Sequence, residues 1–101
     1  MLDFADFKEW LNLPAVSFVH CGGPKNVSAL YFLADGKKLQ YVGCTKYLWN
    51  RISDHRRSGR FSNVDTVHYM LLTGFTPAEA KKLEAEAIWF FKPKKNKQSR
   101  L

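Results

Sequence analysis

Two charged residues of this sequence fall where a helix would pack against the rest of the protein. Between 45 and 57, Leu48, Arg51, Ile52 and His55 recur every three or four residues, so a helix places all four on one face. Arginine and histidine usually avoid a packed face, because a buried charge is costly unless it is paired. A guanidinium suits phosphate binding and an imidazole suits proton transfer, so this face is the first indication of a site.

A carboxylate gives a second indication. A helix over 77–91 would carry an apolar stripe made of Ala80, Leu83, Ala87, Ile88 and Phe91, and Glu84 lies inside that stripe. An ionised carboxylate there needs a cation or a metal ion, or it takes up a proton. The pattern leaves two interpretations open, a functional carboxylate and a structural buried pair with Arg51. Glu86 lies off the stripe, where a surface ion pair with Lys82 explains it.

Local patterns predict the elements that position these residues. Asp35-Gly36 between two apolar runs is a strong β-hairpin signal. Thr45 can cap the helix that follows, and Gly59 lies just beyond its end. Thr76-Pro77-Ala78-Glu79 is a capping box with proline at the first helical position. We therefore predict strands over 30–33, 39–42 and 64–72 and helices over 45–57 and 77–91.

The hairpin register decides whether two tyrosines share a face. A two-residue turn at 35–36 pairs Tyr31 with Gln40 and puts Tyr31 and Tyr41 on opposite faces. A three-residue turn with a bulge pairs Tyr31 with Leu39 and puts both tyrosines on the same face. If both tyrosines serve one site, the second register is required.

Length and composition indicate a single α+β domain. With 101 residues, 46% of them hydrophobic and 15% aromatic, the chain can form a modest core and is unlike a disordered protein. We expect a small three-stranded antiparallel sheet flanked by helices. Residues 1–28, which the family resemblance described below leaves outside the core as an N-terminal extension, are predicted to hold an amphipathic helix over 2–12 and a short strand or extended cover over 16–19. This extension either caps the core or contacts a substrate or partner.

The sequence contains no apolar run long enough to span a bilayer, and its first ten residues are acidic overall, so we expect a cytoplasmic protein. Cys21 and Cys44 lack the spacing of metal ligands and are interpreted as reduced thiols. His20 and His68 have no partners at metal-ligand spacing and are interpreted as structural or surface residues.

The net charge of +7 is concentrated in two clusters. Residues 51–60 hold four arginines against one aspartate, and residues 92–100 hold five bases and no acid. Such clusters suit a polyanion such as nucleic acid, or they form a solvated surface that aids solubility. The residues expected to contact nucleic acid are Lys46, Arg56, Arg57, Arg60, Lys92, Lys94, Lys95 and Lys97.

Taken together, these motifs resemble the GIY-YIG nuclease superfamily. Ala29-Leu30-Tyr31 is a degenerate first signature, Tyr41-Val42-Gly43 matches the second, and Arg51 follows on the next helix. The resemblance covers a domain over 29–96, which leaves 97–101 as a basic tail. It implies a three-stranded antiparallel sheet flanked by helices and phosphodiester cleavage with one divalent metal ion.

The resemblance also implies a metal ligand. Relatives carry a metal-binding glutamate nine positions before a proline and twelve before an asparagine, and Pro93 and Asn96 select Glu84. We expect Glu84 to hold one Mg²⁺ or Mn²⁺ ion, with water filling most of the coordination shell. Asn96 would contact phosphate or brace the site.

The remaining implied roles concern proton transfer and charge. Tyr41 or Tyr31 would activate water, since a phenol near a cation and a metal can have its pKa lowered. Arg51 would bind the scissile phosphate, and His55 would assist proton transfer or bind phosphate. Cys44 follows the second signature where many relatives have a polar or basic residue, and this change could weaken activation of the nucleophile.

We therefore predict a divalent-metal-dependent endonuclease acting on DNA, with RNA not excluded. It is expected to select DNA structure or strandedness more than sequence, unless a protein partner supplies targeting. The first alternative is a catalytically weak nucleic-acid-binding module that keeps the fold. A small interaction protein is a third interpretation, but it leaves Glu84 and Arg51 on packed faces without a reason.

Overall fold

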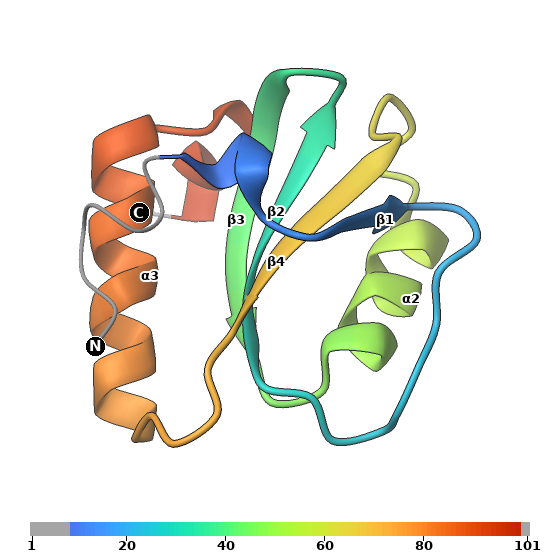
Figure 1. Cartoon of the computed structure of the whole chain (residues 1–101). Helices are drawn as coiled ribbons and strands as arrows, with labels where there is room; N and C mark the ends of the chain where they lie inside the picture. Colours follow the sequence, from blue (N-terminus) through green and yellow to red (C-terminus); the bar gives the residue numbers. More distant parts are fainter. Residues whose placement is uncertain (1–8, 100–101) are drawn as a thin grey trace.

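The computed structural model describes residues 9–99 of the chain. A four-stranded antiparallel sheet forms its centre, with one helix on each face (Figure 1). The strands are β1 (Ala15–Ser17), β2 (Ala29–Asp35), β3 (Lys38–Thr45) and β4 (Thr66–Leu71), and the helices are η1 (Trp10–Asn12), α2 (Leu48–Ser58), α3 (Pro77–Phe91) and η2 (Lys94–Ser99). The strand order is β1-β4-β2-β3, so β3 forms the edge opposite β1.

The inner strand β2 is buried on both faces, which explains its unbroken apolar sequence. Successive side chains of a strand point to opposite faces, so β2 supplies two cores. The core on the α3 face includes Leu30, Phe32, Val42, Leu83 and Ala87, and the core on the α2 face includes Tyr31, Leu33, Leu48, Ile52 and Phe61. Tyr31 therefore belongs to the core on the α2 face, whereas α3, the helix that carries Glu84, packs on the opposite face of the sheet.

The α+β class is confirmed, but the sheet has four strands where three were predicted. The additional strand is β1, which pairs with β4 through Val16 and Val67. Most of the helix predicted over 2–12 lies outside the described residues, and its last three residues form η1. There Trp10 stacks on Phe32 with ring centroids 6.1 Å apart. The boundaries of the extension and of the tail stay predictions.

The hairpin places both tyrosines on one face, but both predicted pairings of Tyr31 are wrong. Asp35 pairs with Lys38 around a tight turn in which Gly36 has φ +62°, a conformation that favours glycine. Between Leu33 and Ala34 the register then shifts by one residue at a bulge. Because of this bulge Tyr31 pairs with Gly43, and Tyr31 and Tyr41 share the α2 face.

Helix α2 begins later than predicted. Thr45 remains in β3, and its hydroxyl accepts a hydrogen bond from Tyr47 N at 3.0 Å instead of capping the helix. Tyr47 holds the N-cap position without a side-chain bond. At the other end Gly59 adopts the left-handed conformation, φ +77°, so the predicted glycine stop is confirmed.

Helix α3 matches its prediction at both ends. Thr76 and Glu79 form the reciprocal capping box, with bonds of 3.1 and 2.9 Å, and Pro77 occupies the first turn. The helix ends at Phe91, and Lys92 takes a left-handed conformation before Pro93. This local agreement fixes the helix that carries Glu84.

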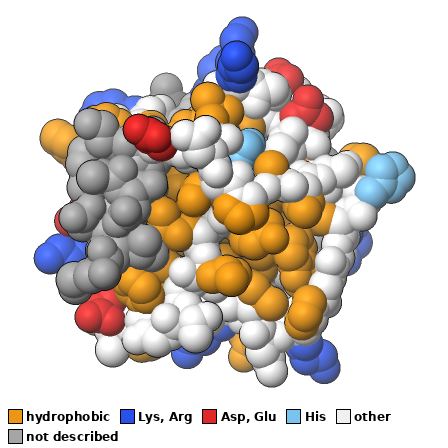
Figure 2. All heavy atoms as spheres, viewed as in Figure 1, with side chains coloured by type: hydrophobic (Ala, Val, Ile, Leu, Met, Phe, Trp, Pro, Cys, Tyr) orange, Lys and Arg blue, Asp and Glu red, His pale blue; other side chains and the backbone are white. Residues whose placement is uncertain are grey.

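The face carrying β1 and β4 shows little charge. Figure 2 shows hydrophobic side chains gathered over its centre, with Lys and Arg side chains around the outline. On β4, Leu71 is 54% exposed. No described helix has the length and apolar character needed to cross a membrane. Because the side of the molecule that carries β1 and β4 shows little charge, we look for contact with a polyanion at β3, the opposite edge of the sheet.

Candidate active site

The site is built around Tyr31, which is buried on the α2 face of the sheet. Its ring crosses the backbone of Gly43, the residue with which it pairs on β3. A Cβ atom at Gly43 would overlap Oη and Cζ of Tyr31. The glycine of the second signature is therefore required because it leaves room for the phenol.

His55 on α2 completes a group of rings on this face. Its Nε2 atom forms a 2.8 Å hydrogen bond with Tyr31 Oη. Its ring centroid lies 5.1 Å from that of Tyr41 and 4.8 Å from that of Phe61. The structure thus brings together three predicted site residues from β2, β3 and α2, and Phe61 packs beside them.

The two hydrogen-bonded groups are both neutral at pH 7. Burial raises the pKa of the Tyr31 phenol well above its ordinary value, and the charge of Glu84 acts in the same direction, while Arg51 opposes both. Burial, followed by the charges of Arg51 and Arg60, lowers the pKa of His55 to about 4. In the metal-free protein Tyr31 therefore shows the opposite of the pKa shift expected from the sequence.

Arg51 differs from its predicted position. Leu48 and Ile52 are buried and His55 is half-buried, but Arg51 is exposed. It lines an open hollow of about 320 Å³ together with Thr45, Tyr47, Asn50 and Asp54, which we call the arginine hollow. An exposed guanidinium remains available to a phosphate.

The structural alternative for Glu84, a buried pair with Arg51, is wrong. The two helices lie on opposite faces of the sheet, and Glu84 pairs instead with Lys81 Nζ at 3.4 Å. The side chain of Glu84 is 19% exposed. Its charge nevertheless contributes to the pKa shift of Tyr31 across the sheet edge.

The rest of the predicted α3 pattern is largely as expected. Leu83 and Ala87 are buried, and the other members of the stripe are partly buried. The ion pair predicted between Lys82 and Glu86 is wrong: within residues 9–99 neither residue forms an ion pair with the other, and Glu84 pairs with Lys81. Glu86 is half-buried, in the same burial class as Glu84.

The donor set fits a weakly chelated hard cation. Within residues 9–99 no three acidic, histidine or cysteine side chains are grouped as a metal site. Glu84 supplies one partly buried carboxylate near the edge strand β3, which carries side chains with hydroxyl groups. This suits Mg²⁺, which prefers oxygen ligands and keeps much of its water, and it does not suit a zinc site.

Asn96 braces the edge strand. Its Oδ1 accepts from Val42 N at 2.9 Å and its Nδ2 donates to Val42 O at 3.1 Å. Val42 lies between Tyr41 and Gly43, so this side chain satisfies the outward backbone groups of β3 inside the second signature. The geometry favours bracing over phosphate contact for a residue that is only 5% exposed.

Solved structures share this architecture. The GIY-YIG N-terminal endonuclease domain of UvrC from Thermotoga maritima, bound to its catalytic divalent cation magnesium, aligns with a TM-score of 0.61 over 94% of this chain and 99% of that one, at 20% identity. A point mutant of that domain aligns over 94% and 98% of the two chains with a TM-score of 0.60 and 20% identity.

The chain has the GIY-YIG fold. No family model matches the sequence, and no curated protein matches it either. At 20% identity the likeness to the UvrC domain establishes the fold alone. The site geometry must therefore support any statement about chemistry.

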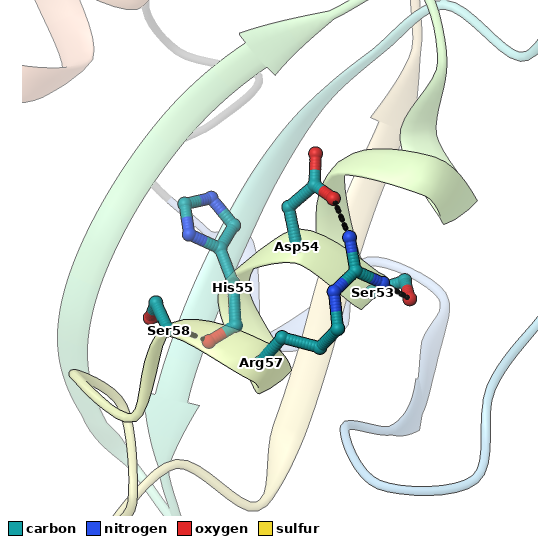
Figure 3. A network of polar contacts seen from close by, with 5 residues as sticks. All are labelled: Ser53, Asp54, His55, Arg57 and Ser58. Atoms are coloured by element: carbon teal, nitrogen blue, oxygen red, sulfur yellow. Dashed lines mark hydrogen bonds and ion pairs between the residues drawn. The ribbon is translucent and has the colours of Figure 1, made fainter.

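In this GIY-YIG fold, two of the predicted basic residues are used within the protein. Arg56 donates to Phe18 O at 2.9 Å and to Cys21 Sγ at 3.4 Å, so it fastens the N-terminal segment to α2. Arg57 bonds to Ser53 and Asp54 on its own helix, on the side away from the His55 ring (Figure 3). Neither points toward the edge strand β3.

The other predicted basic residues are distributed around the site. Arg60 and Lys95 each donate to the backbone carbonyl of the other, at 3.2 and 2.6 Å, and both cations lie over the Phe61 ring. Lys92 lies over the Trp89 ring, Lys46 and Lys94 are exposed, and the side chain of Lys97 lies outside the described part.

Sequence reasoning missed Phe61 and Lys81. Phe61 is a single apolar residue within the polar loop 59–63, which is a weak sign that its side chain is buried. Lys81 stands three residues before Glu84, a spacing that predicts a helical ion pair. The sequence therefore contains a sign of each residue's role, but it also offers other residues as equally plausible partners for the site.

Proposed function

We propose that the chain is a divalent-metal-dependent endonuclease that hydrolyses phosphodiester bonds in DNA. It selects DNA structure or strandedness more than sequence, and it works in the cytoplasm, where a protein partner can supply targeting. The observation that carries the proposal is the convergence of Tyr31, Tyr41 and His55 with the charges of Arg51 and Glu84 at the end of β3.

Arg51 would bind the scissile phosphate from the arginine hollow. Its side chain is exposed and points from the first turns of α2, so a strand can reach it without rearrangement of the core. A guanidinium offers paired donors that match two phosphate oxygens. It would also stabilise the additional negative charge that develops in the transition state.

Tyr31 and His55 would accept the proton that the attacking water releases. The neutral imidazole can accept a proton through the 2.8 Å bond to Tyr31 as the attacking water gives up its own. An arriving phosphate offsets the positive charges that lower the pKa of His55, and this makes the imidazole a better base. Tyr41, less buried and adjacent in the ring group, would orient the water.

Glu84 would hold the metal ion, with Asn96 keeping β3 in register beneath it. When bound, Mg²⁺ or Mn²⁺ supplies a Lewis acid for the phosphate and leaving oxygens. The Lys81 ammonium, 3.4 Å from Oε1, would compete with the metal ion for this carboxylate. This ion pair favours the second candidate function, a nucleic-acid-binding module with weak or no catalysis.

Purified protein incubated with single-stranded, duplex, flap and junction DNA, and with RNA of the same sequence, tests the proposal. Cleavage in Mg²⁺ or Mn²⁺ but not in EDTA is expected, with one branched or single-stranded form cut fastest. Binding without cleavage under every condition would favour the second candidate function. Cleavage that persists in EDTA would refute the metal-dependent mechanism.

A further inference from the structure

An apolar hollow lies beside the candidate site. It has a volume of about 140 Å³ and opens between the end of β3 and the start of α3. Its apolar lining includes Leu72, Phe75 and Ala80, and Cys44 forms part of the wall. The polar residues Thr45 and Thr76 and the basic residues Lys46 and Lys81 also line it. We refer to it as the apolar hollow.

This hollow shares lining residues with the neighbourhood of the proposed catalytic residues. Thr45 lines both the apolar hollow and the arginine hollow that contains Arg51. On the other side, Lys81 lines the apolar hollow and pairs with Glu84 at 3.4 Å. The proposed phosphate ligand Arg51 and metal ligand Glu84 are thus each linked to the lining of the apolar hollow through one residue, Thr45 and Lys81 respectively.

The size and lining restrict what could enter. Typical small-molecule sites have volumes of roughly 300–1,000 Å³, so this hollow accepts only a small group. An aromatic ring and aliphatic side chains provide surfaces for a flat apolar group, and the hydroxyls can bond to a polar edge. A nucleobase has this combination of apolar faces and a polar edge. The two lysines at the rim suit the phosphates attached to it.

We propose that the apolar hollow receives an unpaired base of a nucleic-acid strand whose adjoining phosphate lies at Thr45, between Arg51 and Glu84. The inference rests on the proposed function in taking nucleic acid as the substrate. A base inside a duplex is stacked on both faces and paired at its edge, so it must leave the helix first. The hollow therefore selects strands with at least one unpaired base next to the scissile phosphate.

Binding without metal tests this separately from cleavage. The affinity of the protein for a thymidine oligomer of about ten nucleotides is compared in EDTA with that for an abasic oligomer of the same phosphate count, by fluorescence anisotropy. Stacking on one aromatic side chain corresponds to roughly 5- to 150-fold in affinity, and we expect a preference within this range. The same oligomer paired in a duplex should lose that preference.

Ala80→Phe fills the hollow and should remove the preference while leaving affinity for the abasic oligomer within about twofold. Ala85→Phe adds the same side chain at an exposed position of α3 outside the hollow and should keep it. If Ala80→Phe does not fold, as judged by circular dichroism, Phe75→Leu removes the ring and should weaken the preference instead.

Equal affinity of the wild-type protein for thymidine and abasic oligomers would overturn the inference, as would a preference retained after the hollow is filled. Competition by thymidine monophosphate at lower concentration than the oligomer would show a free-nucleotide site and would also overturn it. A protein that keeps the preference but never cleaves refutes the proposed function only. One that cleaves without the preference refutes this inference only.

Discussion

Gly43→Ala should distort the site and destabilise the domain. The added Cβ overlaps Oη and Cζ of Tyr31, and Tyr31 cannot retreat because it is 1% exposed and bonded to His55. Overpacking a core costs about 1–3 kcal/mol, and a lost hydrogen bond about 0.5–1.5 kcal/mol. The free energy of unfolding should fall by roughly 2–4 kcal/mol, which lowers Tm by roughly 10–30 °C for a domain of this size.

Thermal unfolding followed by circular dichroism measures this, with Gly22→Ala as the control. No atom lies within 4 Å of a Cβ built at Gly22, so that variant should unfold near the wild-type temperature. Tyr31→Phe removes Oη, one of the three overlapping atoms, so the double variant should be less destabilised than the sum by about 1 kcal/mol. A wild-type Tm for Gly43→Ala, or strictly additive effects, would refute the packing argument.

Three further predictions follow from the site. Arg51→Ala should slow cleavage at saturating substrate by about 100-fold or more while retaining most DNA affinity, measured by single-turnover kinetics and anisotropy; a loss confined to affinity would contradict the transition-state role. Because the pKa of His55 is about 4 in the folded protein and ordinarily near 6.5, the unfolded state takes up the proton first as pH falls. Stability should therefore drop between pH 6.5 and 4, and His55→Gln should reduce that drop in urea titrations; an unchanged pH slope would contradict it. Asn96→Ala leaves Val42 N–H and C=O without their partner and should cost about 1–3 kcal/mol, with faster hydrogen exchange at the Val42 amide; unchanged exchange would show that Asn96 does not brace β3.

The features read correctly from the sequence are those decided by local chemistry. The capping box at Thr76–Glu79 and the glycine stop at Gly59 depend only on nearby backbone groups, so their residue types were sufficient. The apolar stripe of α3 placed the Glu84 carboxylate on the more buried side of the helix, where its side chain is 19% exposed. These positions required no knowledge of the tertiary structure.

The errors arose where packing between distant elements decides the outcome. The hairpin register depends on a bulge in the β2–β3 ladder between Leu33 and Ala34, which the turn residues alone do not specify. Arg51 was placed on the packed face because its spacing matches that of Leu48, Ile52 and His55, but a long side chain at the border of that face can extend its charged end into water. In the structure β3 continues through Thr45, α2 begins at Leu48 and the guanidinium remains in solvent.

The raised pKa of Tyr31 could not be inferred from the sequence either. Its largest cause is burial, which follows from the position of β2 inside the sheet and from the packing of α2 over it. The sequence showed nearby cations and therefore suggested the opposite shift. Burial outweighs the single opposing charge of Arg51 in this case.

Metal-dependent cleavage by Glu84→Gln and Glu86→Gln tests the central claim most directly. Successive helical residues turn by about 100°, so these two glutamates point to nearly opposite sides of α3. Glu84→Gln should abolish cleavage in Mg²⁺, because a neutral amide is a poor ligand for the ion, and should retain the folded structure. Glu86→Gln should cleave at nearly the wild-type rate. Normal cleavage by both variants would contradict the single-metal mechanism, whereas an active Glu84→Gln with an inactive Glu86→Gln would show that the metal ligand was assigned to the wrong glutamate.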